Sequence, residues 1–339
     1  MPKNRQKTET VSTIPNTEAR NATSLIPQPP NQVEIMKNFT ALHSSNGRFC
    51  ECEHSCVAKR VKPFTSVVAI ATRDSARYIQ EVICHHFLVG FDRICIGLDH
   101  RTTDNTLAKI EALPPAVLEK VAVSINASSG EVCVWQGHWY DTIAREYQST
   151  AEWLATFDDD EYFYDSQHRS INAILNSLPT TTGCALIPWL VFGHSDHVLS
   201  PPHGTTRLEY FTSVYDPPPL REEYKSIVRL SNINMDDWYG IHFHRHTGDA
   251  TTLNNESVLN REHWDAEIVN CDTCLAHYMC GSMEDYVVRC KKWLDRFPGK
   301  PQANAGGVKY FMERFTMTGN DTRMTSYVQE LKQLLAQCK

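Results

Sequence analysis

The sequence lacks three features, and each absence excludes a class of protein. No stretch approaches the roughly 18 consecutive apolar residues of a membrane-spanning helix. The N-terminal segment M-P-K-N-R-Q-K-T-E-T has no apolar core after its charges, so it does not look like a secretory signal. Positive charge is not in excess, because the formal net charge is −7, which argues against a broad nucleic-acid-binding surface. We therefore expect a soluble protein, with the cytoplasm as the favoured compartment.

The twelve cysteines are too dispersed along 339 residues for a small disulfide-rich scaffold. Neither of their two clusters has the paired C-x-x-C spacing of a zinc ribbon or knuckle. Each cluster lies near a histidine, His54 or His277, so zinc binding stays open, but the spacing favours disulfides or plain thiols. The clusters are Cys50, Cys52 and Cys56, and Cys271, Cys274 and Cys280.

Composition and apolar periodicity divide the chain into three parts. Residues 1–62 are rich in Asn, Thr, Ser, Pro and charge, which is typical of a flexible arm. Residues 63–300 alternate apolar runs with helical patterns and are expected to form a single catalytic domain. Residues 301–339 are expected to form a C-terminal helical extension, because apolar residues recur there at helical spacing. These residues are Met324, Tyr327, Val328, Leu331 and Leu335.

Strands and helices alternate at the start of the middle part. This series predicts an α/β fold with a mostly parallel, doubly wound sheet flanked by helices. Such sheets bind nucleotides outside the carboxyl ends of their strands, which is where Asp99 and Asp158 are expected to stand. The expected elements are strands at 67–71, 94–98 and 121–125, and helices at 75–90 and 104–113, capped by Ser75 and Asp104.

The alternation continues through the rest of the middle part. A helix is expected to open at Ser282, because Ser282 with Asp285 resembles a capping box. The other expected elements are helices at 141–152 and 170–178, a strand from Trp153, a strand at 184–192, and short strands at 208–211 and 227–230.

The stretch W-L-A-T-F-D-D-D-E-Y-F, residues 153–163, places four consecutive acids directly after an apolar run. Carboxylates between buried segments repel one another and are costly to desolvate unless positive charge lies among them. A bound cation is the simplest compensation, and a solvated acidic turn is the alternative. The flanking aromatic residues favour a functional site at a strand end.

Six segments together resemble the inverting glycosyltransferases of the GT-A fold, and glycosyltransferase family 92 in particular. They occur in the family's order between about Ser66 and Phe297, roughly two thirds of the chain. The segments are A-R-Y-I-Q-E-V-I-C-H-H-F-L-V-G-F-D-R, G-L-D-H-R-T-T-D-N-T, W-L-A-T-F-D-D-D-E-Y-F, W-L-V-F-G-H-S-D-H, K-S-I-V and A-H-Y. The resemblance implies a GT-A type, Rossmann-like domain that transfers a sugar, galactose as a first guess, from a UDP-sugar to a glycan hydroxyl.

Two segments depart from the family's pattern. Its opening K-N-E corresponds here to Arg73-Asp74-Ser75, so the usual third acid is absent. Its FGSSGH segment corresponds to F-G-H-S-D-H, in which Asp196 replaces a glycine. These departures bear on the donor's base and sugar rather than on the fold.

For the donor, the resemblance implies Mn²⁺ or Mg²⁺, which would neutralise the diphosphate as the glycosidic bond breaks. Asp158 and Asp160 are the expected metal ligands, because alternate residues of an extended segment point to the same side. His277 is the candidate imidazole ligand that would favour manganese, and the alternative is a core histidine.

The nucleotide itself is expected to contact residues at three strand ends. Asp99 suits the base or ribose of uridine, and its alternative role is to cap a turn. Lys225 would pair with a phosphate, and its alternative is an isolated surface charge. Thr72, Arg73 and Asp159 complete the expected nucleotide contacts.

Inversion needs a general base that removes the acceptor hydroxyl's proton during in-line attack. Glu209 and His197 match positions in the family's pattern, and Glu209 is narrowly favoured. The candidates are Glu161, Glu209, Asp196 and His197. Trp189 or Phe192 could stack on a sugar ring, although an aromatic residue beside a strand is more often part of the core.

Two other classes of protein compete with the transferase. A metal-dependent hydrolase would need a tighter His/Asp ligand set around Asp158 and would turn over without an acceptor. A non-catalytic module that holds Ca²⁺ in its acidic run would bind metal without nucleotide affinity. The order of the six segments favours the transferase.

Overall fold

The computed structural model describes residues 62–126, 132–214, 224–236, 242, 244–256, 272–296, 311–313 and 315–339. All of them belong to one unit, Arg60–Lys339. Apart from Lys62, the expected arm lies outside the described residues, as do the Cys50 cluster and Cys271. In the described part of the chain, every helix is too short or too polar to cross a membrane.

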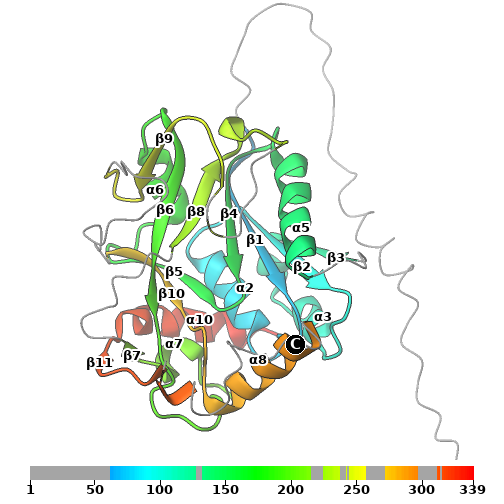
Figure 1. The fold of residues 1–339 in the computed structure, drawn as a ribbon, viewed down its shortest axis with the longest axis vertical. Coiled ribbons are helices and arrows are strands. Elements are labelled where there is room, and N and C mark those ends of the chain that lie inside the picture. The colour runs from blue at the N-terminus through cyan, green and yellow to red at the C-terminus, as the bar shows by residue number, and fades with distance from the viewer. Residues whose placement is uncertain are drawn as a thin grey trace, which may run out of the picture. The chain divides into compact units, whose positions relative to one another are not determined.

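A large mixed sheet forms the centre of this unit (Figure 1). In spatial order its described strands are β3-β2-β1-β4-β8-β6-β10-β5, and β9 pairs with β6. Five of these eight described pairings are parallel, which confirms the expected mostly parallel α/β sheet. The strands are β1 (Phe64–Thr72), β2 (Arg93–Asp99), β3 (Val121–Asn126), β4 (Ala151–Asp158), β5 (Glu161–Asp165), β6 (Thr182–Val191), β8 (Tyr224–Arg229), β9 (Asp249–Thr252) and β10 (Thr273–His277).

Helices flank the sheet, and a small second sheet joins β7 (Ser213–Val214) to β11 (Gly319–Asn320). Both faces of β1 are buried, and successive residues face different helices. Val68 and Ile70 belong to the core that includes α2, α6 and α10, whereas Val67 and Ala69 pack in the core that includes α5. The helices are α2 (Ile79–Leu88), α3 (Thr106–Glu111), α4 (Pro115–Leu118), α5 (Val132–Tyr147), α6 (Ile171–Ser177), α7 (Arg207–Tyr210), α8 (Met283–Arg296) and α10 (Val328–Leu335), with 3-10 turns η1 (Leu230–Asn232) and η2 (Arg323–Tyr327).

The strand order 3-2-1-4 places a topological switch point between β1 and β4. The chain leaves β1 in one direction through β2 and β3 and returns to β4 on the other side of β1. Open α/β sheets bind ligands in the crevice outside the carboxyl ends of the strands at such a point. The ends of β1 and β4 coincide here, because Ala71 pairs with Asp158 in the sheet register.

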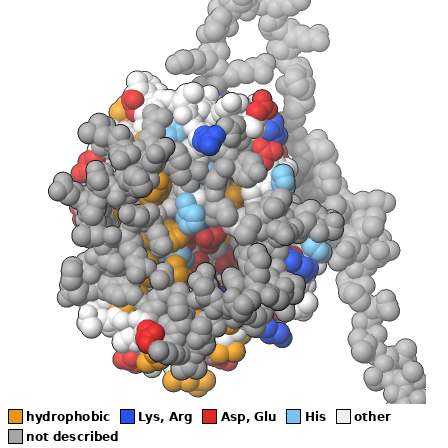
Figure 2. Space-filling view, viewed as in Figure 1, with side chains coloured by type: hydrophobic (Ala, Val, Ile, Leu, Met, Phe, Trp, Pro, Cys, Tyr) orange, Lys and Arg blue, Asp and Glu red, His pale blue; other side chains and the backbone are white. Residues whose placement is uncertain are grey.

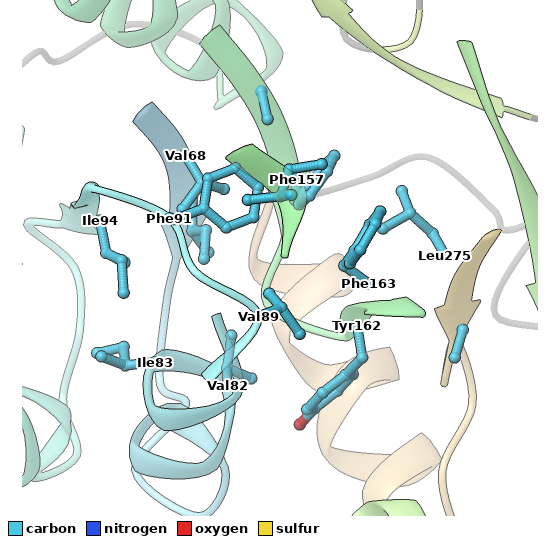
Figure 3. Packing of buried hydrophobic residues seen from close by; sticks show 14 of the residues in the cluster. Val68, Val82, Ile83, Val89, Phe91, Ile94, Phe157, Tyr162, Phe163 and Leu275 are labelled. Carbon is cyan, nitrogen blue, oxygen red and sulfur yellow. The ribbon is translucent and has the colours of Figure 1, made fainter. Parts of the chain in front are cut away.

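The core beneath this switch point is aromatic. The rings of Phe91 and Phe157 meet edge to face between α2 and the sheet (Figure 3). Their centroids lie 6.1 Å apart. Tyr162 and Phe163 of β5 are also fully buried. Burial of these side chains on both sides of residues 158–161 fixes the strand ends that hold the four acids.

Three expected elements differ from the structure. The helix expected at 141–152 begins at Val132 and ends at Tyr147, because Ala151 already starts β4. Residues 207–210 form the helix α7 rather than a strand, since Thr206 and Glu209 make a capping box at its start. Ser75 does not cap α2, which begins only at Ile79 without a side-chain cap.

The expected terminal helix packs on the main unit. Met324 and Leu331 are fully buried, and α10 lies against α2. The capping box expected at the start of α8 is confirmed: the Asp285 N–H donates to Ser282 Oγ at 3.1 Å, and the Ser282 N–H donates to Asp285 Oδ2 at 3.0 Å.

Candidate functional site

The four acids Asp158–Glu161, here termed the acidic turn, connect strands from different parts of the sheet. Asp158 is the last residue of β4, Glu161 is the first residue of β5, and the two residues between them form a turn. The expectation that Asp158 and Asp160 share one side of an extended segment is therefore wrong. Their side chains meet different partners.

Asp158 pairs with a lysine that is completely buried on β8. Lys225 Nζ lies 2.9 Å from Asp158 Oδ2 and 3.6 Å from Glu161 Oε2, and Gln136 Nε2 donates to Asp158 Oδ1 at 3.2 Å. Burial alone would raise the pKa of Asp158, but Lys225 outweighs it and lowers that pKa. Burial opposes the charge of Lys225 too, yet Asp158 and Glu161 raise the pKa of this lysine. Lys225 is thus an internal counter-ion of the acidic turn and not a surface charge.

Asp159 ties the acidic turn to the end of β1. The Thr72 hydroxyl donates to Asp159 Oδ2 at 2.5 Å, and the Ser75 hydroxyl donates to the same oxygen. On the opposite side, Arg207 Nη1 donates to the Asp159 carbonyl at 3.3 Å. These hydrogen bonds hold the turn at the switch point between β1 and β4.

Asp160 is buried between two side chains that can carry positive charge. Arg289 Nη1 of α8 donates to Asp160 Oδ2 at 2.9 Å, and His277 Nε2 lies 3.2 Å from Asp160 Oδ1. Burial would raise the pKa of Asp160, but His277 and then Arg289 outweigh it and hold that pKa well below its usual range. Asp160 likewise raises the pKa of His277 against the effect of burial. The structure therefore brings His277 to the acidic turn.

Three buried polar atoms around Asp160 have no hydrogen-bond partner among the described residues. They are Asp160 Oδ1, Glu161 Oε1 and His277 Nδ1. Leaving such an atom unsatisfied costs about 1–3 kcal/mol, and native proteins keep few of them without water, an ion or a functional reason. Glu161 is fully buried, and this burial raises its pKa to about 7. In the described part of the chain, unpartnered buried atoms also occur away from the acidic turn, as at Trp153 Nε1 and Thr182 Oγ1, so these three atoms are consistent with a bound ligand but do not define a site by themselves.

The expected nucleotide contacts lie at the same edge of the sheet. Asp99 ends β2 beside β1, and its buried carboxylate accepts from Arg101 Nε at 2.9 Å and from Arg101 Nη2 at 2.5 Å. Burial would raise the pKa of Asp99, but these hydrogen bonds lower it. Arg73 follows Thr72 directly, and its Nε lies 3.2 Å from Asp74 Oδ2. Parallel neighbours thus assemble the ends of β1, β2 and β4 as expected.

Glu209, the favoured general base, makes two structural contacts. The Thr206 N–H donates to Glu209 Oε1 at 2.7 Å in the capping box of α7. Lys332 Nζ of α10 lies 2.7 Å from Oε1 and 2.9 Å from Oε2. Burial would raise the pKa of Glu209, but the Lys332 ammonium lowers it. A role as base therefore requires that Lys332 release one carboxylate oxygen.

Glu161 belongs to the acidic turn itself, and the two remaining base candidates lie on the loop after β6. His197 stacks on Tyr210 with ring centroids 3.7 Å apart, and its Nε2 lies 3.0 Å from the Tyr210 carbonyl oxygen. Asp196 has a positive φ of 59°, and its side chain is 93% exposed. Within the described part of the chain, no hydrogen bond or ion pair joins either side chain to the acidic turn.

The two aromatic candidates for sugar stacking differ in position. Phe192 is buried and stacks on Tyr278 with ring centroids 4.6 Å apart, so it belongs to the core. Trp189 is half-buried, and its ring centroid lies 4.2 Å from that of His277. Trp189 is therefore the one of the two that lies next to the acidic turn.

Sequence reasoning found Lys225 and His277 but missed three other basic side chains near the acidic turn. Arg289 and Lys292 of α8 reach the site from near the C-terminus, and Arg207 reaches it from α7. Their spacing of three residues places Arg289 and Lys292 on one side of α8, and this basic pair is the sequence signal that could have found them. In Figure 1, α8 lies below the ends of β1 and β4.

The side chains around the acidic turn fit a divalent cation only in part. The described ranges contain no group of three or more His, Cys, Asp or Glu side chains that converge to hold an ion. A divalent cation fits the donor set in part: Asp160 Oδ1 is a buried oxygen without a hydrogen-bond donor, and an imidazole lies beside it. Cys274 and Cys280 are buried free thiols, as the favoured interpretation of disulfides or plain thiols allows, and the zinc alternative for their cluster is untested because Cys271 lies outside the described residues.

The side-chain chemistry is visible on one face of the molecule. Figure 2 shows acidic side chains near the middle of that face, with histidine and hydrophobic side chains beside them. This mixture of charge, imidazole and apolar surface is typical of a binding site for a polar organic ligand.

Comparisons with known proteins identify no family for this chain. No family model matches the sequence, and no curated protein matches it either. Among solved structures, a mannosyltransferase from Pyrobaculum calidifontis, PcManGT in complex with GDP-Man and Mn²⁺, is similar at 17% identity and a TM-score of 0.27. The likeness covers 37% of this chain and 35% of that chain, and a similarity this low carries no argument about function. The resemblance to glycosyltransferase family 92 therefore stays a prediction.

Proposed function

We propose that this chain is a glycosyltransferase that moves a sugar from a nucleotide-diphosphate donor to a hydroxyl of a glycan acceptor. One observation carries the proposal: the acidic turn stands at the topological switch point, surrounded by Lys225, His277 and Arg289, with unpartnered buried atoms among them. A diphosphate with its metal counter-ion needs carboxylates that hold the ion and basic side chains that contact the phosphates. Sheets of this type bind nucleotides at the switch point. A UDP-sugar is the first donor to test.

In this proposal the nucleotide lies across the ends of β1 and β2. Asp99 accepts from the base or ribose, because its carboxylate oxygens keep lone pairs beyond those that Arg101 occupies. Thr72, Arg73 and Asp159 line the approach to the phosphates. Lys225 supplies fixed positive charge beneath them.

Mn²⁺ or Mg²⁺ is the proposed cofactor. Asp158, Asp160 and His277 are the proposed ligands; they do not converge on one point in the described structure and would have to turn toward the ion, which would act as a Lewis acid on the departing diphosphate. Asp158 must then share its carboxylate between Lys225 and the ion. His277 would have to bind as neutral imidazole, so metal affinity should fall as the pH drops and the ring is protonated.

The acceptor is proposed to approach from the side of Trp189, whose ring could stack on a sugar. Inversion then needs a base near the acceptor hydroxyl. Glu209, His197 and Asp196 remain the proposed candidates, and a pH–rate profile of Glu209→Gln, His197→Asn and Asp196→Asn would choose among them.

The test is thermal stability with a panel of UDP- and GDP-sugars, in Mn²⁺ or in EDTA. A ligand at 100 times its Kd adds about 2.7 kcal/mol to the free energy of unfolding. We expect one nucleotide sugar to stabilise the wild type only with Mn²⁺, and Asp160→Asn to abolish that gain. Glu111→Gln, on the exposed surface of α3, is the matched control and should keep the stabilisation by nucleotide sugar and Mn²⁺.

Two outcomes would replace the proposal. If metal stabilises the protein equally with and without nucleotide, the acidic turn is a structural ion site, as in a Ca²⁺-binding module. If the donor is consumed at the same rate without any acceptor, the protein is a hydrolase.

A further inference from the structure

Helix α8 places two basic side chains on the two loops that border the acidic turn. Arg289 Nη1 donates to Asp160 Oδ2 at 2.9 Å and also to the Met279 carbonyl. One turn further along, Lys292 Nζ donates to the carbonyl oxygens of Arg73 and Asp74, each at 2.7 Å. The carboxyl end of β1 and the acidic turn are thus both held by one face of α8.

Arg289 is not a buried structural arginine. Its side chain is 50% exposed, whereas the Asp160 carboxylate that it contacts is only 12% exposed. The other oxygen of that carboxylate, Oδ1, faces His277 and accepts no hydrogen bond from any described residue. One oxygen of a deeply buried acid is therefore covered by a half-exposed guanidinium, and the other lies 3.2 Å from the His277 imidazole.

We propose that Arg289 is a built-in counter-cation that competes with a divalent metal ion for Asp160, and that the displaced guanidinium, with Lys292, then binds the diphosphate of the donor. The first half concerns metal binding to the protein without nucleotide. The second half rests on the proposed function, because it assumes a nucleotide-diphosphate ligand.

Charge supports the exchange. A guanidinium on Asp160 Oδ2 and a divalent cation on Oδ1 repel each other, so each weakens the binding of the other to this carboxylate. Guanidinium groups form bidentate hydrogen bonds with phosphate, and a lysine adds a compact point charge. The Arg289 side chain is half-exposed, and α8 keeps it beside the site.

The proposal predicts opposite effects of one substitution on two ligands. Arg289→Gln should bind Mn²⁺ alone about tenfold more tightly than the wild type, because the ion no longer competes with the guanidinium. The same variant should bind UDP or GDP, whichever the wild type prefers, about tenfold more weakly in EDTA. A loss of fold would weaken both, so opposite signs cannot arise from unfolding.

Two companion variants sharpen the experiment, with affinities measured by titration calorimetry. Lys292→Gln should weaken nucleotide binding and leave Mn²⁺ affinity unchanged, because Lys292 contacts no carboxylate of the acidic turn. Arg145→Gln is the matched control: Arg145 is also 50% exposed, lies 2.9 Å from an aspartate and donates to a backbone carbonyl, but on the surface of α5. It should change neither affinity.

Each result supports or overturns one half of the proposal, either the competition for Asp160 or the binding of the diphosphate. Unchanged or weaker Mn²⁺ binding by Arg289→Gln overturns the competition, whatever the nucleotide results are. Unchanged nucleotide binding by Arg289→Gln and Lys292→Gln overturns the diphosphate role. If the wild type binds neither UDP nor GDP, the proposed transferase function fails, while the Mn²⁺ titrations still decide whether Arg289 competes for Asp160.

Discussion

Two buried glutamates, Glu81 of α2 and Glu161 of the acidic turn, have similar burial and different surroundings. Burial raises the pKa of both to about 7. Both oxygens of Glu81 accept hydrogen bonds: the Arg207 N–H donates to each, at 3.1 and 3.0 Å, and the Tyr162 hydroxyl donates to Oε1 at 3.1 Å. Glu161 accepts one hydrogen bond, from the Asp158 N–H at 2.8 Å, and its Oε1 has no partner among the described residues.

The difference separates structural from functional use of buried charge. The Glu81 network joins α2, α7 and β5 and has its carboxylate fully satisfied, as a structural network should be. The acidic turn leaves polar atoms unsatisfied and surrounds them with cations from β8, β10 and α8. Native proteins tolerate such a cost chiefly where a ligand repays it.

The largest effect is expected when the acidic turn loses its internal counter-ion. Lys225→Met leaves the Asp158 and Glu161 carboxylates without their buried partner, which should lower the free energy of unfolding by about 3–5 kcal/mol. Lys332→Met removes an ion pair that is 40% exposed on its lysine side and should cost less than about 1 kcal/mol. Urea unfolding of both variants is the measurement. Equal losses in the free energy of unfolding would mean that the buried Lys225 ion pairs contribute no more to stability than the exposed Lys332 ion pair.

The second prediction concerns pH. The folded-state pKa of Glu81 and Glu161, about 7, lies above the ordinary value of 4.5, so the folded protein binds more protons than the unfolded chain between these pH values. Their contribution to stability is therefore present below about pH 4.5 and is lost as the pH rises to about 7, by on the order of 3 kcal/mol for each group. Glu161→Gln and Glu81→Gln should each flatten this decline in urea unfolding from pH 4.5 to 7. A slope equal to that of the wild type would show that the group is ionised throughout.

The smallest effect separates the two networks by function. Thr72→Val and Tyr162→Phe each remove one hydroxyl that donates to a carboxylate, and each should cost about 1 kcal/mol of stability. Only Thr72→Val should also weaken nucleotide-sugar binding, because only its hydroxyl contacts the acidic turn. Calorimetric titration of both variants with the preferred donor measures this, and equal affinities would contradict the position of the site.

Sequence reasoning succeeded where the chain's own pattern carries the information. The apolar runs of β1, β2 and β4 are continuous because parallel strands are buried on both faces, so their ends at Thr72, Asp99 and Asp158 could be located from the sequence. It failed for α7, because the capping chemistry of Thr206 and Glu209 outweighed the apolar look of residues 208–211.

The sequence by itself determined that four acids follow a buried strand of a mostly parallel α/β sheet, because hydrophobic periodicity and the alternation of strands and helices along the chain are local properties. Only the tertiary structure decided how those acids are compensated. Lys225 lies 67 positions beyond Asp158, and His277 and Arg289 lie 117 and 129 positions beyond Asp160, and no local pattern reports a contact over that separation. Desolvation forces buried carboxylates to find positive charge, but the fold selects which side chains supply it.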